Sequence, residues 1–326
     1  MTKSKVKNPL IIILILALIA VGAWFFVQKT ASDKAEEEVQ KFLVKNNLQD
    51  NLTYAKLEAS PTGTATLKEV KFLDDEGDVI LLADELNLNK YKEDTDFLEV
   101  DIDIKKLMDA NGDLQEGLNK AFAHSDKPVP QYLDTASHFK LDGAADEAIF
   151  KSSVIIPDYI ELESVLTTDS PTALLQLMRS IDENPDMENF DPELLESLGQ
   201  VKLKELSVEA RDIGGVKSLL YALDGAQSSD AYTSLSAEER EEKLQNRVAA
   251  ARQECPESDV QFHMIEDIDN ACDILYDFLE NKRSTVKIKL TLTKPMHIDE
   301  LMVLFFMGGQ HIEQILNEYK PRVVVE

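Results

Sequence analysis

The sequence predicts an α+β fold, in which antiparallel β-sheets pack against helices after a single N-terminal transmembrane helix. Three observations lead to this prediction. Leu10–Val27 is an uncharged stretch of eighteen residues. Between residues 52 and 106, apolar and polar residues alternate with the period of two that marks strands. After residue 169, apolar stripes at helical spacing follow recognisable helix starts.

The first element is a predicted transmembrane anchor over residues 9–28. As a helix, Leu10–Val27 spans about 27 Å, close to the thickness of a bilayer core. Trp24–Phe26 stands near its end, where aromatic residues meet the membrane interface. The alternative is a cleaved secretory signal with its cleavage site at Val21–Ala23. The apolar run continues through that site, which favours the uncleaved anchor.

Charge at the N-terminus predicts the topology. Lys3, Lys5 and Lys7 precede the apolar stretch, and such lysines keep their end of a helix in the cytoplasm. Residues 1–8 are therefore expected to form a cytoplasmic tip, and everything after the anchor to lie outside the cytoplasm. The lipid bilayer is a predicted partner through this helix.

The composition narrows the class of protein. The net charge is −27, from 61 acidic and 34 basic residues, so nucleic acid, which needs a basic face, is not expected as a partner. Hydrophobic residues make up 44% of the chain, enough for a buried core. We interpret the acidic charge as a solvated surface, with a cationic ligand or partner as the alternative.

The next two regions are a helical stalk and a mainly β region. Residues 29–47 are the stalk, and residues 48–168 form the β region. In the latter, the acidic turn at 74–78 with its glycine predicts a hairpin. Alternation over 98–104 predicts a strand with one wet and one buried face.

Helices return after residue 169. Residues 169–200 are a predicted helical insertion, and residues 201–326 a C-terminal region of helices and strands. In that region Ser236 and Glu239 have the spacing of a capping box. The alternating residues 286–292 predict a last strand, which Pro295 is expected to end.

The two cysteines are expected to pair. Outside the cytoplasm, Cys255 and Cys272 in one chain usually form a disulfide. Closing the loop between them is worth about 3 kcal/mol by chain entropy. Two cysteines do not complete a tetrahedral metal site, so no metal is predicted. No cofactor is predicted either.

No motif indicates catalysis. The sequence lacks His-Glu-x-x-His, Gly-x-Ser-x-Gly and a glycine-rich phosphate loop, so we assign no catalytic residue and do not expect an enzyme. Weak calcium binding at acidic turns stays open. At residues 109–120, however, the calcium-loop pattern fails, because Leu114 stands where glycine is needed and Lys120 where glutamate is needed.

The longest apolar run outside the anchor is Leu301–Met307, seven consecutive residues. We expect it to be buried against the strand at residues 286–292. The alternative is the wall of an acyl-chain groove. In either case Leu301, Leu304, Phe305 and Phe306 are its candidate contact residues.

The layout has a counterpart among known proteins. An anchor, a stalk and the strands Leu67–Phe72 and Leu81–Leu88 resemble bacterial inner-membrane-anchored envelope proteins of the AsmA-like and YdgA-like groups, as the pattern Lys294–Leu301 resembles periplasmic proteins. The resemblance implies a single-pass inner-membrane protein whose C-terminal domain is periplasmic. It also implies long sheets that carry lipid between membranes, although the helical middle of this chain departs from a continuous conduit.

Together these features predict a non-enzymatic binding or structural protein for envelope assembly, maintenance or lipid handling. Its candidate partners are lipid or another envelope protein. The alternative is an accessory subunit of a membrane complex, docking through its acidic exterior domain.

Overall fold

The structure is a computed structural model, and the residues that it describes are 51–59, 64–74, 77–122, 125–176, 199, 201–227, 236–255, 265–297 and 318–326. The predicted anchor, the stalk, most of the helical insertion and the run Leu301–Met307 lie outside the described residues. Among the residues that are described, no helix is long and apolar enough to cross a membrane.

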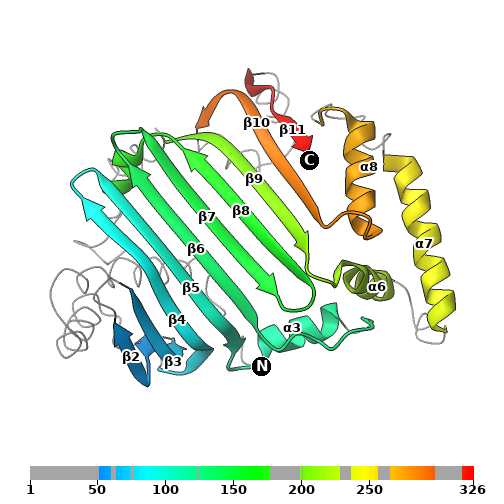
Figure 1. The fold of residues 1–326 in the computed structure, drawn as a ribbon, viewed down its shortest axis with the longest axis horizontal. Helices are drawn as coiled ribbons and strands as arrows, with labels where there is room; N and C mark the ends of the chain where they lie inside the picture. Colours follow the sequence, from blue (N-terminus) through cyan, green and yellow to red (C-terminus); the bar gives the residue numbers. More distant parts are fainter. Residues whose placement is uncertain are drawn as a thin grey trace, which may run out of the picture.

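One antiparallel sheet of eleven strands dominates the fold (Figure 1). The order is β1-β3-β4-β5-β6-β7-β8-β9-β10-β11, and β2 also pairs with β3. The strands are β1 (Leu52–Thr53), β2 (Lys56–Ala59), β3 (Ala65–Leu73), β4 (Val79–Asp94), β5 (Phe97–Asp109), β6 (Leu133–Asp142), β7 (Glu147–Ile156), β8 (Ile160–Thr168), β9 (Lys202–Asp212), β10 (Thr285–His297) and β11 (Arg322–Val325). Pairing of β8 with β9 joins the predicted β region (residues 48–168) and the C-terminal region (residues 201–326) in a single sheet.

The named helices are α3 (Asp113–Ala121), α6 (Val216–Gln227), α7 (Ala237–Glu254) and α8 (Ile268–Leu279). In Figure 1 they gather at one side of the sheet, with α7 outermost. The predicted combination of antiparallel strands with packed helices is thus confirmed.

The sheet has an apolar face and a charged face, as the alternation in the sequence predicts. On β5, Leu98, Val100 and Ile102 are buried on the apolar face. The residues between them are acidic and belong to the opposite, charged face. Ion pairs link strands on that face: Lys90–Glu99 at 2.8 Å, Lys151–Glu163 at 2.7 Å, Lys289–Glu205 at 3.0 Å and Arg211–Glu161 at 3.1 Å.

Two clusters of buried side chains cover parts of the apolar face. The first lies over β3–β7 and includes Leu67, Leu88, Val100, Leu141 and Leu175. The second joins the helices to the other end of the sheet through Phe122, Tyr159, Ile160, Val216, Phe278 and Val286. Ile160 of β8 and Val286 of β10 lie on the apolar face. The helices α3, α6 and α8, which pack against them, therefore cover the same face as the first cluster.

Tyr159 fixes the start of α6 against the turn between β7 and β8. It is 1% exposed, and its hydroxyl lies 2.8 Å from Ser125 Oγ and donates to the Pro128 carbonyl at 3.1 Å. Asp212 Oδ1 accepts hydrogen bonds from three backbone N–H groups at the start of α6, including Gly215 at 2.8 Å. Gly215 also donates its N–H to the Tyr159 carbonyl at 3.1 Å. The Asp212 carboxylate thus satisfies N–H groups at the start of α6 that would otherwise have no partner.

The C-terminal strands differ from the sequence-based expectation. Pro295 was expected to end the last strand, but β10 continues to His297. The pairing with β9 shifts between Thr291 and Met296, and at such an irregularity a proline, which has no N–H to donate, is tolerated. Strand β11 was not predicted, although its three consecutive valines are a β-type signal.

Helix α7 begins with the predicted capping box. Ser236 Oγ accepts from the Glu239 backbone N–H at 3.2 Å, and a Glu239 carboxylate oxygen accepts from the Ser236 N–H at 2.7 Å. The Ser236 backbone N–H stabilises the carboxylate and lowers the pKa of Glu239. This cap therefore contributes fully above the ordinary carboxyl range and is lost as the pH falls through the lowered pKa.

The end of α7 is attached to α8 covalently and by charge. Cys255 and Cys272 form a disulfide with a Cα–Cα distance of 6.0 Å. One turn earlier, the Arg252 guanidinium contacts Asp273 at 2.6 Å and two further carboxylates of this segment, Asp277 and Glu280, at 3.2 Å each. Hydrogen bonding to Asp273 raises the pKa of Arg252. The bridge and these ion pairs join the end of α7 to α8.

We predict that the intact, unreduced protein has a mass lower by two hydrogens than its sequence, because Cys255 and Cys272 are joined. Mass spectrometry before and after reduction checks this. Neither thiol should react with an alkylating reagent until a reductant is added. Two freely alkylated thiols in the native protein would contradict the assignment.

Candidate functional site: the central band of the apolar face

The sequence-based site residues Leu301, Leu304, Phe305 and Phe306 lie outside the described residues. The strand against which they were expected to pack is described. In that strand Val286 is 4% exposed, whereas Ile288 is 42% exposed. Part of the apolar face of β10 is therefore uncovered by the described chain.

Ile288 belongs to a row of directly paired residues that crosses five strands. The row, which we call the central band, consists of Ser137 (β6), Ser152 (β7), Ser164 (β8), Val208 (β9) and Ile288 (β10). At its ends, Ser137 pairs with the buried Ile102 of β5, and Ile288 pairs with Val325 of β11. Because paired residues share a face, the band lies on the apolar face.

Four of the five residues of the band are exposed and Ser164 is half-buried, in contrast to the buried clusters on either side of it. Ser137 and Ser152 are exposed, and Val208 and Ile288 are each 42% exposed. Leu162, diagonal to Val208, adds a further large side chain at 38%. A contiguous exposed apolar surface is typical of a site that contacts a ligand, a membrane or another protein.

The rows that flank the band contain no charged residue. On one side lie Phe139, Phe150, Leu166, Leu206 and Leu290. On the other side lie Thr135, Val154, Leu162, Ala210 and Val286. The rings of Phe139 and Phe150 are 4.6 Å apart, as expected for neighbours on one face. The surface offers hydrocarbon and hydroxyl contacts but no formal charge.

The serines of the band are suited to binding rather than to nucleophilic attack. Ser164 Oγ donates to the Ser152 carbonyl at 3.5 Å. The Ser137 and Ser152 hydroxyls make no hydrogen bond within the described part of the chain. A serine nucleophile needs a nearby base, and these three rows contain neither histidine nor carboxylate. Hydroxyls without a protein partner can instead bond to a ligand.

A cluster of ionisable side chains on the charged face is an alternative candidate site. Asn89 Nδ2 donates to Asp103 at 2.8 Å and to Asp101 at 3.3 Å. His138 lies 3.7 Å from Asp101 and 3.9 Å from Glu99. Across all described residues, no group of three His, Cys, Asp or Glu side chains could hold a metal ion, at this cluster or at the acidic turns. We interpret the cluster as part of the ion-pair network of the charged face.

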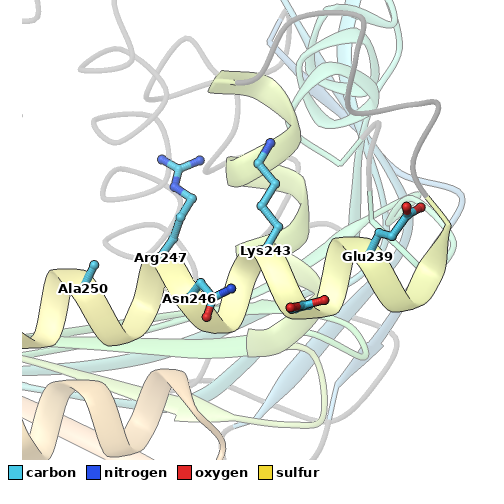
Figure 2. Close-up of a pocket in the computed structure, with 6 residues that line it drawn as sticks. Glu239, Lys243, Asn246, Arg247 and Ala250 are labelled. Carbon is cyan, nitrogen blue, oxygen red and sulfur yellow. The ribbon is translucent and has the colours of Figure 1, made fainter.

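A hollow lies beside α7. Its lining residues are Glu239, Glu242, Lys243, Asn246, Arg247 and Ala250, all from this one helix. Figure 2 shows Lys243 and Arg247 projecting to the same side of α7. A surface built by one helix face has no second described wall, so we do not assign a ligand to it.

No protein-family model matches this sequence, and no curated protein matches it. The assignment of a site therefore depends on the geometry of the sheet.

Sequence reasoning missed the central band because its members are far apart in the chain. Each serine follows or precedes a large apolar residue at the spacing of one strand face, as in Phe150–Ser152 and Ser164–Leu166. This pattern is a signal for a polar position on an apolar face. Only the strand register brings the three serines into one row.

Proposed function

We propose that this protein is a membrane-anchored, non-enzymatic binding protein that serves envelope maintenance or lipid handling, with its C-terminal domain in the periplasm. The observation that supports the proposal is the uncharged, exposed central band on the apolar face of β6–β10. Its occupation by hydrocarbon would remove the apolar surface of Val208, Ile288 and Leu162 from water, at about 25 cal/mol per Å².

The opposite face supports the same assignment. Cross-strand ion pairs such as Lys151–Glu163 and Lys289–Glu205, whose side chains are partly exposed, lie on that face. Charged side chains are stable in contact with water, whereas the apolar face has a surface to cover. The anchor predicted at Leu10–Val27 would keep this surface near a source of lipid.

Photo-crosslinking of the full-length protein in bacterial membranes tests the proposal. A benzophenone amino acid at Ile288 lies on the central band, and one at Lys287 is the matched control, because neighbouring residues of a strand point to opposite faces. We expect lipid adducts, identified by mass spectrometry, at position 288 and few at 287. Cross-links to another protein would favour the accessory-subunit alternative. Absence of lipid adducts at position 288 would contradict lipid handling at this site.

The topology is a separate prediction. The three lysines before Leu10 predict that Glu326 lies outside the cytoplasm. A reporter that is active only in the cytoplasm, fused after Glu326, should stay inactive, whereas one that is active only in the periplasm should work. Activity of the cytoplasmic reporter would overturn the topology and, with it, the proposed place of action.

A further inference from the structure

We propose that the central band binds an uncharged acyl ester, such as a neutral glycerolipid, with its ester and hydroxyl groups over the serines and its hydrocarbon over Val208 and Ile288. This inference rests on the proposed function and specifies the ligand of the same surface.

The band has two chemically different halves. Its β6–β8 half presents the hydroxyls of Ser137, Ser152 and Ser164, and its β9–β10 half presents Val208 and Ile288. With strands about 4.8 Å apart, five strands extend about 19 Å across the sheet. A ligand that lies across the strands meets a polar segment of roughly half this length and then an aliphatic one.

Hydrogen-bonding capacity is available in the polar half. Within the described chain, Ser137 and Ser152 are exposed and their hydroxyls have no partner. A hydroxyl can donate to an ester carbonyl and accept from a ligand hydroxyl. A surface that contacts hydrocarbon alone would need only apolar residues at these positions. Three serines in one row therefore indicate contact with a ligand that carries polar atoms beside its hydrocarbon.

Charge determines which polar atoms fit. The band and both flanking rows have no cation to pair with a phosphate or carboxylate, and no carboxylate to pair with an amine. The ion-paired Lys151 and Lys289 lie on the opposite face. The whole chain carries a net charge of −27, which repels anionic head groups. An uncharged surface in an acidic protein is complementary to an uncharged ligand.

The test uses the full-length protein in phosphatidylcholine vesicles with trace amounts of diazirine-labelled probes. Three probes are compared: a neutral diacylglycerol, a fatty acid and an anionic phosphatidylglycerol. After irradiation, labelled peptides from β7, β8 and β9 are quantified. We expect the diacylglycerol to label these peptides at least about tenfold more than either charged probe does.

Serine variants then connect that selectivity to the band. Ser152→Ala is expected to lower diacylglycerol labelling about fivefold, a loss of the size of one neutral hydrogen bond. The triple variant of Ser137, Ser152 and Ser164 to alanine should abolish the preference. Ser153→Ala is the matched control. The Ser153 side chain belongs to the charged face, because neighbouring residues of a strand point to opposite faces, so this variant should leave labelling unchanged.

The possible outcomes separate the two proposals. Equal labelling by all three probes, unchanged in the serine variants, would overturn the ester assignment while lipid handling stands. If no probe labels the band, or if a photo-crosslinker at Ile288 reacts only with a second protein or with residues 298–317 of the same chain, both proposals fall. Selective labelling that is lost only in the band variants supports both.

Discussion

Replacing Gly215 by alanine is expected to lower the melting temperature by roughly 6–12 °C, from a loss of about 3 kcal/mol of unfolding free energy. A Cβ at this position would lie 2.3 Å from Tyr159 Cα and 2.5 Å from the Asp158 carbonyl oxygen. Both are backbone atoms of the tight turn between β7 and β8, so no side-chain rotation relieves the overlap. Either the turn or the start of α6 must shift.

The shift would extend beyond the glycine. The Gly215 N–H donates to the Tyr159 carbonyl at 3.1 Å and to Asp212 Oδ1 at 2.8 Å. Moving α6 outward would lengthen these bonds and loosen Val216 and Phe278 in the second cluster. Thermal unfolding followed by circular dichroism measures the effect.

Gly117→Ala is the matched control. A Cβ at Gly117, inside α3, meets nothing within 4 Å. Alanine is favoured over glycine in a helix by about 0.5–1 kcal/mol, so this variant should melt slightly above the original protein. If Gly215→Ala melts at the same temperature as Gly117→Ala, that result would contradict the close contact between Gly215 and the β7–β8 turn.

The strands were the part of the fold that the sequence predicted best. The apolar residues from Leu98 to Ile104 are buried on one side as predicted, because β5 is paired on both edges and covered on that face. The opposite side is only partly wet, because Glu99 is buried beside Lys90. The pattern is less clear in β3, where Leu67 and Val70, three residues apart, are both buried. Glu69 between them has a φ of 54°, which interrupts the two-residue period. Local pattern does not predict such an interruption.

The connection between strands and the site depended on non-local information. Nothing near Ser164 in the sequence shows that its partners are Ser152 and Val208. Those pairings follow from the register of separate hairpins and from the pairing of β9 with β8, more than thirty residues earlier in the chain. The disulfide was easier to predict from the sequence, because two cysteines allow a single pairing.

Leu304→Asp is the variant expected to have the second large effect. It tests the burial that the sequence predicts for the apolar run Leu301–Met307. Seven consecutive apolar residues cannot form an amphipathic element, so a folded domain must cover them on most sides. Covering each Leu or Phe side chain contributes about 1.5–3 kcal/mol. A carboxylate in their midst would be buried without a partner and should cost several kcal/mol.

The measurement combines stability with ligand contact. If Leu301–Met307 is core, Leu304→Asp lowers the melting temperature by more than about 6 °C, whereas the volume-conserving Leu304→Met costs less than about 1.5 kcal/mol. If the run instead forms a wall of the ligand site, Leu304→Asp leaves the melting temperature nearly unchanged and abolishes diacylglycerol labelling of β7–β9. An unaltered melting temperature together with lost labelling would therefore reject the core assignment and extend the central band to Leu301–Met307.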